Sequence, residues 1–472
     1  MSAPEPRQED VQATFCAVVV DQWVEMGLRN AFVSPGSRST PMAMALAERA
    51  EVRTEVVHDE RAAGFMALGA GLASGMPAVA LCTSGTAATH FHAAAVEADI
   101  SGVPLILCTA DRPPEAQGIR SAQTIDQQNL YGPVVRAFTD FGVPTWGERD
   151  SWRTQAANVL ARTTGFSRGP VHVNLPFREP LVGASQEYSD FGPASLSEQQ
   201  AVHASKDTLR QIASVCAGKR GVVVAGAGVA GDKRLVNLAD KLGWPLLADS
   251  RSGLQHEDSA VCHADAILRS AGVTSSLKPE VVLQFGEGPA SKVVNQFLHD
   301  GRTTVIQISD RPEVRDPWRD VTVHVNADIA AVIKALSNMV DSGARGFQEQ
   351  WSAAEKLART AIADLVGSTF SEPAIAATVA NSARKGEVIV ASSSMPVRDL
   401  EWYSRIPKGV RVLANRGANG IDGVLSTAIG VATTTDKRTF VMIGDVALLH
   451  DSSALAALSR RDLNLRIVVN HN

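Results

Sequence analysis

Short apolar runs alternate with helical patterns along almost the whole chain, and this alternation constrains the fold more than any other feature. The first block, over about residues 10–185, has strand candidates at 30–34, 53–57, 78–83, 104–109 and 171–175. Helical patterns such as those at 11–26 and 60–74 lie between these runs. Such alternation is typical of a parallel sheet with helices on both faces.

Two further blocks repeat this pattern. Residues 206–345 contain the apolar runs RGVVVAGAG, WPLLAD, EVVLQFG and TTVIQIS, after a polar stretch, GASQEYSDFGPASLSEQQ, that has the composition of a linker. A helical segment at 347–366 leads to EVIVASSS, RVLANRG, TFVMIGD and LRIVVN. We expect an α/β protein of three doubly wound parallel-sheet domains, at 1–190, 206–345 and 346–472. Because a doubly wound domain rarely ends on a strand, we also expect the C-terminal part of the last domain to be missing here.

Composition narrows the class of protein. The chain has 472 residues, of which 45% are hydrophobic, enough for about three domains with buried cores. Its net charge of −5 argues against non-specific nucleic-acid binding, and no apolar run reaches the ~20 residues of a membrane helix. The N-terminus, MSAPEPRQED, is too polar for a secretory signal. The five cysteines form no CxxC pair, which favours free thiols in a reducing cytoplasm.

Polar, arginine-rich turns follow many of the expected strands. Ligands of open α/β sheets bind outside the carboxyl ends of the strands, so these turns are the candidate site. They read SPGSRS, HDER, TSGT, ADRPP, SSSMPVR and NRG. Arginine on a loop is often only a solvated surface charge, but several at equivalent strand ends favour a cationic rim for carboxylates, which arginine binds bidentately.

Three acidic or amide residues lie at strand ends. Glu60 begins a helix, where it either complements the helix dipole or serves as a partly buried carboxyl group with a raised pKa. Asp445 and Asn472 each follow an apolar run, and the helix between them makes those two strands parallel. Their oxygens either end strands or meet across the sheet edge, where they would suit Mg²⁺.

The middle block contains a glycine motif, Gly226-x-Gly228-x-x-Gly231, with Asp249 at the end of the next strand. This arrangement matches the dinucleotide-binding fingerprint. A single match is weak, because such glycines also pack a helix closely against a strand. The motif leaves open a nucleotide-binding or regulatory protein as an alternative function.

Taken together, these motifs resemble those of the thiamine-diphosphate enzymes. The pattern Gly-Asp followed about 26 residues later by Asn is similar to their cofactor signature, and the three blocks resemble their pyrimidine-binding, middle and diphosphate-binding domains. SPGSRSTP, HDERAAGFMALGAGLASG, TADRPPE, NRGANGIDG and GDVALLHDSSALAAL resemble most closely the family of 2-succinyl-5-enolpyruvyl-6-hydroxy-3-cyclohexene-1-carboxylate (SEPHCHC) synthases of menaquinone biosynthesis. The resemblance covers all three blocks and is weakest in the middle one.

The resemblance implies a role for each matching residue. Glu60 matches the catalytic glutamate that hydrogen-bonds the aminopyrimidine ring of the cofactor. Asp445 and Asn472 match the ligands of Mg²⁺, or Mn²⁺, which bridges the cofactor diphosphate. The other implied cofactor contacts are Ser393, Ile421, Gly444 and Val446, and the implied substrate contacts are Arg38, Arg112, Gln123, Lys292, Ser394, Arg398 and Arg416. Of these, Lys292 lies in the least similar block.

The reaction implied is a carbon–carbon bond-forming transfer, in which 2-oxoglutarate is decarboxylated and its remainder is added to isochorismate. Both substrates are dicarboxylates, which agrees with the cationic rim. The family also implies a cytoplasmic homodimer or homotetramer with the cofactor between subunits. The sequence departs from the family at Asn419, where a small hydroxyl residue is common. The alternative within the thiamine enzymes is an acetolactate-synthase-like enzyme or a 2-oxoacid decarboxylase.

Overall fold

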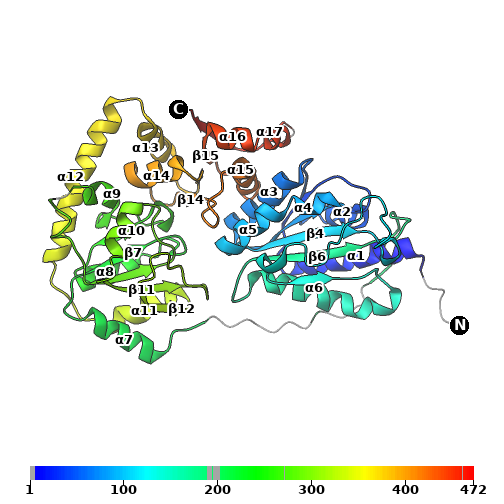
Figure 1. Cartoon of the computed structure of the whole chain (residues 1–472), viewed down its shortest axis with the longest axis horizontal. Helices are drawn as coiled ribbons and strands as arrows, with labels where there is room; N and C mark the ends of the chain where they lie inside the picture. Colours follow the sequence, from blue (N-terminus) through cyan, green and yellow to red (C-terminus); the bar gives the residue numbers. More distant parts are fainter. Residues whose placement is uncertain (1–5, 189–193, 195–201, 271, 460, 472) are drawn as a thin grey trace. The chain divides into compact units, whose positions relative to one another are not determined.

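The computed structural model describes residues 6–188, 194, 202–270, 272–459 and 461–471. The chain forms two compact units, which are drawn together in Figure 1. The first unit comprises residues up to Gln199 together with Asn415–Arg438 and Val446–Leu465. The second comprises Gln200–Ala414, Thr439–Asp445 and the residues from Arg466 onward. Most of the expected linker at 183–200 lies outside the described residues.

A six-stranded parallel sheet organises the first unit, with strand order β2-β1-β3-β4-β6-β5. Helices α1 and α6 pack on one face, and α3 and α5 lie on the other (Figure 1). The strands are β1 (Asn30–Val33), β2 (Arg53–Val56), β3 (Ala78–Cys82), β4 (Leu105–Asp111), β5 (Phe138–Asp140) and β6 (Pro170–Pro176). The helices are α1 (Gln8–Glu25), α2 (Thr40–Glu48), α3 (Glu60–Ser74), α4 (Thr86–Thr89), α5 (His92–Ser101) and α6 (Arg149–Thr164).

Helix α15 (Val424–Thr433) belongs to the first unit and packs directly on α3. The two helices approach so closely that a Cβ on Gly430 would lie 1.9 Å from the Met66 carbonyl oxygen. A Cβ on Gly69 would lie 2.1 Å from the carbonyl oxygen of Thr427. Glycine at both positions therefore sets the distance between the helices. Helix α17 (Ser453–Leu458) contacts α15 in the same unit.

The second unit contains a six-stranded parallel sheet with order β12-β11-β10-β7-β8-β9. Helices α7, α8 and α11 cover one face, and α9, α10 and α12 cover the other. Alternation along β7 separates the faces, because Val223 packs with the first group and Val222 with the second. The strands are β7 (Gly221–Ala225), β8 (Leu246–Ala248), β9 (Ala260–Val261), β10 (Val281–Phe285), β11 (Thr304–Ser309) and β12 (Val321–Asn326). The helices are α7 (Lys206–Cys216), α8 (Arg234–Leu242), α9 (Ala264–Leu268), α10 (Lys292–Leu298), α11 (Ile329–Met339) and α12 (Gly346–Ser368).

A four-stranded sheet, with order β14-β13-β15-β16, forms the rest of the second unit. Its strands are β13 (Val388–Ala391), β14 (Arg411–Leu413), β15 (Thr439–Gly444) and β16 (Leu465–Asn470). Helices α13 (Glu372–Ser382) and α14 (Met395–Tyr403) share its apolar core. A short helix, α16 (Asp445–His450), follows β15 directly. The three parallel sheets confirm the α/β class expected from the sequence.

Two further predictions are answered by burial and helix length. All five cysteines are buried free thiols, as expected from their spacing. Among the helices that the structure describes, none has the length and apolar character needed to cross a lipid bilayer.

Candidate functional site

The turns that follow β1 and β3 pack against each other at the carboxyl edge of the first sheet. A Cβ on Gly36 would lie 2.3 Å from the Cβ of Thr83, so glycine is needed for this approach. Gly85 has φ +86° and donates its N–H to Gln127 Oε1 at 2.9 Å. A Cβ on Gly85 would lie 3.2 Å from the carbonyl oxygen of Gln123. The loop that carries Gln123 is thereby held on the same edge as the β1 turn.

Arg38 and Arg112, which follow β1 and β4, converge on one carboxylate. Arg38 is buried and donates to the Phe177 carbonyl oxygen at 2.9 Å and to Glu179 Oε1 at 2.7 Å. Arg112 Nη1 lies 3.8 Å from the same Glu179 oxygen. Glu179 is 70% exposed, so its carboxylate is a solvated counter-ion within reach of both guanidinium groups. The structure therefore brings these two candidate substrate residues together.

A cavity of about 630 Å³ opens beside Arg112. Its floor is a network of buried polar side chains at the ends of β4 and β6. Asn174 Nδ2 donates to Asp111 Oδ2 at 3.0 Å, and the Arg112 N–H donates to Asp111 Oδ1 at 2.7 Å. Burial raises the pKa of Asp111, while these hydrogen bonds oppose the rise. The network fixes the turn from which the Arg112 side chain extends.

Glu60 is the first residue of α3 and is half-buried. The helix start is fixed by Asp59, whose Oδ1 accepts hydrogen bonds from the N–H of Arg61 at 2.9 Å and of Ala62 at 3.4 Å. Burial, and then the nearby Glu60 carboxylate, raise the pKa of Cys82 at the end of β3 well above its usual value. Glu60 therefore lies at the carboxyl edge of the first sheet, where a catalytic carboxyl group is expected.

The NRGANGIDG segment is held in the first unit by an acid that the sequence analysis did not identify. Glu97 of α5 is buried and accepts hydrogen bonds from the N–H groups of Gly417 and Ala418, both at 2.7 Å. These contacts anchor the loop that carries Arg416 and Ile421, both of which are half-buried. Val446, also assigned to this unit, is 61% exposed.

In the second unit, candidate substrate residues lie at the starts of two helices. Ser393 is buried after β13, and Ser394 is exposed at the beginning of α14 with φ +72°. A left-handed backbone is strained for a residue with a side chain, and such strain is concentrated at functional sites. Arg398 is exposed on α14, and Lys292 is the first residue of α10 and is also exposed.

Asp445 lies where β15 ends and α16 begins, next to the end of β16. His471 Nδ1 lies 2.8 Å from Asp445 Oδ2, so the imidazole of His471 is one neighbour of this carboxylate. Asn472, the second expected metal ligand, lies outside the described residues. Asn470 is 3% exposed, and its amide atoms have no hydrogen-bond partner within the described chain. A Cβ on Gly444 would meet nothing within 4 Å.

These groups fit a metal-bound diphosphate. Asp445 offers a carboxylate, and Gly444 leaves open space beside it. Ser392 and Asn470, at the ends of the adjoining strands β13 and β16, are buried and have polar atoms with no partner among the described residues. Oxygen ligands of this kind are what Mg²⁺ prefers, together with phosphate oxygens.

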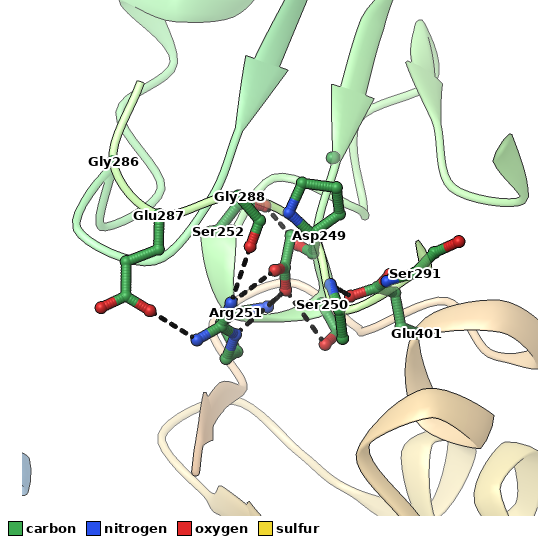
Figure 2. Close-up of polar contacts among 12 residues, drawn as sticks. Asp249, Ser250, Arg251, Ser252, Gly286, Glu287, Gly288, Ser291 and Glu401 are labelled. Carbon is green, nitrogen blue, oxygen red and sulfur yellow. Dashed lines mark hydrogen bonds and ion pairs between the residues drawn. The ribbon is translucent and has the colours of Figure 1, made fainter. Parts of the chain in front are cut away.

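The glycine motif of the middle block is accounted for by packing. A Cβ on Gly226 would lie 1.5 Å from the Glu287 carbonyl oxygen, so the turn after β10 occupies the space above this glycine. Arg251 lies beside the same turn with a nearly buried side chain (Figure 2). It pairs with Asp249 at 2.8 Å and with Glu287 at 2.9 Å. The close approach at Gly226 supports the structural interpretation of the motif over the dinucleotide-binding one.

A cluster of one histidine and two aspartates in this unit could hold a metal by its geometry, but it has a structural explanation. His299, Asp316 and Asp320 have ligand atoms within 4.8 Å of one another. His299 Nδ1 lies 2.6 Å from Asp320 Oδ1, and both Asp316 oxygens accept backbone N–H groups. These hydrogen bonds stabilise the loop before β12.

Comparisons with known proteins agree with the fold. Residues 13–130 match the family model of the thiamine pyrophosphate enzyme N-terminal TPP-binding domain, and residues 193–389 match that of the middle domain of thiamine pyrophosphate enzymes. Thiamine pyrophosphate is another name for thiamine diphosphate. The chain is 36% identical to the SEPHCHC synthase of Listeria monocytogenes strain EGD-e, over 98% of this chain and 83% of that protein.

Enzymes of the same name from other bacteria are similarly related. The identity is 34% to that of Myxococcus xanthus, over 98% of this chain and 83% of the relative. It is 35% to that of Chloroflexus aurantiacus, over 97% and 81%. The chain therefore belongs to the thiamine-diphosphate-dependent SEPHCHC synthase family of menaquinone biosynthesis.

Proposed function

We propose that this chain uses thiamine diphosphate and a divalent cation to decarboxylate 2-oxoglutarate and to add the remaining four-carbon unit to isochorismate. The bond between C1 and C2 of 2-oxoglutarate breaks, CO₂ leaves, one proton is taken up, and a new carbon–carbon bond forms to the isochorismate ring. The convergence of Arg38 and Arg112 on Glu179 beside a cavity carries the substrate assignment. Two dicarboxylates need cationic partners in a site of this kind.

When bound, thiamine diphosphate supplies the electron sink that lets a 2-oxo acid lose CO₂. Asp445 would hold Mg²⁺ or Mn²⁺ beside the diphosphate, with Asn472 as the second expected ligand. Gly444, Val446 and Ser393 would line the cofactor, and Ile421 would support its bent shape. Glu60 would hold a proton at the aminopyrimidine ring.

The substrates would be held by the remaining candidate residues. Arginine grips a carboxylate with two parallel hydrogen bonds, and lysine acts as a point charge. The residues proposed for this role are Arg38, Arg112, Gln123, Lys292, Ser394, Arg398 and Arg416. The protein would act in the cytoplasm as a homodimer or homotetramer, with domains at 1–190, 206–345 and 346–472.

The direct test is turnover by the purified protein with isochorismate, 2-oxoglutarate, thiamine diphosphate and Mg²⁺. Turnover is measured as the loss of isochorismate and the release of CO₂. We expect Glu60→Gln to reduce kcat by about 10²- to 10⁴-fold, the usual contribution of general acid–base catalysis. Glu48→Gln, at an exposed residue at the end of α2, is the control and should keep wild-type turnover. Turnover of pyruvate instead, with a bound yellow flavin, would favour the acetolactate-synthase-like alternative.

A further inference from the structure

Glu401 is a buried acid that neither the sequence motifs nor the proposed mechanism uses. It lies on α14 and is 6% exposed. Its Oε2 accepts a hydrogen bond from the N–H of Ala290 at 2.8 Å, and its Oε1 accepts one from the N–H of Ser291 at 2.9 Å (Figure 2). The carboxyl group thus joins α14 to the turn that immediately precedes α10.

The start of α10 is well ordered by this turn. Ser291 is fully buried, and its Oγ accepts a hydrogen bond from the N–H of Val294 at 3.1 Å and donates to Asp265. Asn295 Nδ2 donates to the Ser291 carbonyl oxygen at 2.7 Å. Lys292 follows Ser291 as the first residue of the helix. The position of Lys292 is therefore determined by the same turn that Glu401 holds.

Helix α14, on which Glu401 lies, carries or begins at two further candidate substrate residues. Ser394 begins the helix with its strained backbone, and Arg398 lies one turn before Glu401. Three candidate substrate residues, Lys292, Ser394 and Arg398, are thus divided between two elements that the Glu401 carboxyl group joins. Each of the three is exposed, so their side chains are accessible to a ligand.

Burying the Glu401 carboxyl group costs free energy, and its surroundings offset little of that cost. Arg251 is the nearby buried cation, but Asp249 and Glu287 both pair with it. A small cavity of about 20 Å³, lined partly by Asp249, Asp265 and Glu401, has room for one water molecule. Burial, and then Asp249, raise the pKa of Glu401 to about 8. An apolar side chain would avoid this free-energy cost, so stability alone does not explain an acid at this position. The positions that its two hydrogen bonds fix give a better explanation.

We propose that Glu401 is a positioning residue for the dicarboxylate substrates, which holds Lys292 at a fixed place relative to Ser394 and Arg398. The proposal rests on the proposed function. It does not give Glu401 contact with a substrate. Its loss should weaken substrate binding while leaving the chemistry of bound substrate intact, which is seen as a higher KM at unchanged kcat.

Glu355 provides a matched control in the same unit. It is a buried acid on α12 that likewise accepts two backbone hydrogen bonds, from Cys262 at 3.2 Å and from His263 at 3.0 Å, just before α9. Neither α12 nor α9 carries a candidate substrate residue. Glu355 also lies 2.8 Å from His263 Nδ1 and 3.3 Å from Arg359 Nη2, so its substitution reports the loss of a buried helix–turn connection together with these side-chain contacts.

The experiment compares Glu401→Gln, Glu401→Ala and Glu355→Gln with the wild type in steady-state kinetics and in thermal unfolding. We expect both glutamate-to-glutamine variants to lower Tm, and Glu355→Gln to lower it more, because it also loses its contacts to His263 and Arg359. Only the Glu401 variants should raise KM for isochorismate or 2-oxoglutarate, by about ten- to a hundredfold, the effect of losing one hydrogen bond to a charged group. Glu401→Gln, which keeps an acceptor oxygen, should have the smaller effect, and it carries the test if Glu401→Ala does not fold.

Wild-type KM values in the Glu401 variants, or an equal rise in Glu355→Gln, would overturn the positioning role while leaving the proposed function in place. Absence of turnover by the wild-type protein would instead overturn the proposed function and this role with it.

Discussion

His471 Nδ1 lies 2.8 Å from Asp445 Oδ2, across the ends of the neighbouring strands β16 and β15. At the proposed metal site, an imidazole in this position would add a nitrogen ligand to a set otherwise made of oxygens. Imidazole suits metals such as Co²⁺ and Zn²⁺, whereas Mg²⁺ prefers oxygen.

We therefore expect His471→Asn to shift metal preference toward Mg²⁺. The measured quantity is the metal concentration that half-saturates thermal stabilisation in the presence of thiamine diphosphate. In the variant, the ratio of this concentration for Co²⁺ to that for Mg²⁺ should be about tenfold higher than in the wild type. An unchanged Co²⁺-to-Mg²⁺ ratio would show that His471 does not contribute to the metal site.

Glu179 should compete with the substrates for Arg38 and Arg112. Its carboxylate lies 2.7 Å from Arg38 and 3.8 Å from Arg112, and it is largely exposed. An exposed ion pair is worth about 0.2–1 kcal/mol, so Glu179→Gln should lower KM for a dicarboxylate substrate by up to about fivefold. Arg38→Ala should raise the same KM. A higher KM in Glu179→Gln would mean that this carboxylate assists substrate binding instead.

Two glycine-to-alanine substitutions should have opposite effects on the free energy of unfolding, because only one of them lies at the contact between α3 and α15. Gly430→Ala places a Cβ against the Met66 carbonyl oxygen and should lower the free energy of unfolding by about 1–3 kcal/mol. Gly367→Ala, on α12, meets nothing within 4 Å and should raise it by about 0.5 kcal/mol. Urea unfolding measures both values, and a neutral Gly430→Ala would contradict the close helix contact.

Burial of Glu401 predicts a pH-dependent stability. Its folded-state pKa of about 8 lies above the ordinary value of 4.5, so the folded state binds the extra proton between these pH values. The stabilisation is complete below pH 4.5 and is lost as pH rises through 8, with a slope of at most about 1.4 kcal/mol per pH unit. The groups facing Glu401 are Asp249 and Arg251 from the turn after β8, and Asp265 from α9.

Glu401→Gln should remove this slope, so the stability advantage of the wild type over the variant should shrink from about pH 5 to pH 8 and stay constant above that. Chemical unfolding of both proteins at a series of pH values measures it. Parallel curves would show that Glu401 has the same pKa in the folded and unfolded states.

The sequence predicts most of the elements because buried parallel strands have a strong local signal. Helix α3 begins and ends at the residues expected from its apolar spacing, Glu60 and Ser74. The short strand β5 and the polar, alternating strand β12 were not expected, since neither is a continuous apolar run.

The candidate site depends more on tertiary contacts. Strand ends in the sequence locate Arg38 and Arg112, but their shared partner Glu179 follows a different strand. Glu97 and Glu401 bind backbone groups far away in the sequence, which no local pattern reports. His471 was not expected beside Asp445, because the sequence does not fix the last residue of the final strand. Successive residues of a strand point in opposite directions, so an error of one residue changes which side chain faces Asp445.

The central claim is that the Asp445 edge binds a metal-bound diphosphate, and thermal unfolding with thiamine diphosphate and Mg²⁺ tests it most directly. A ligand that binds only the folded state at 100 times its Kd stabilises that state by about 2.7 kcal/mol. We predict a clear rise in Tm for the wild type and none for Asp445→Asn. No rise in the wild type, or an equal rise in the variant, would contradict the claim.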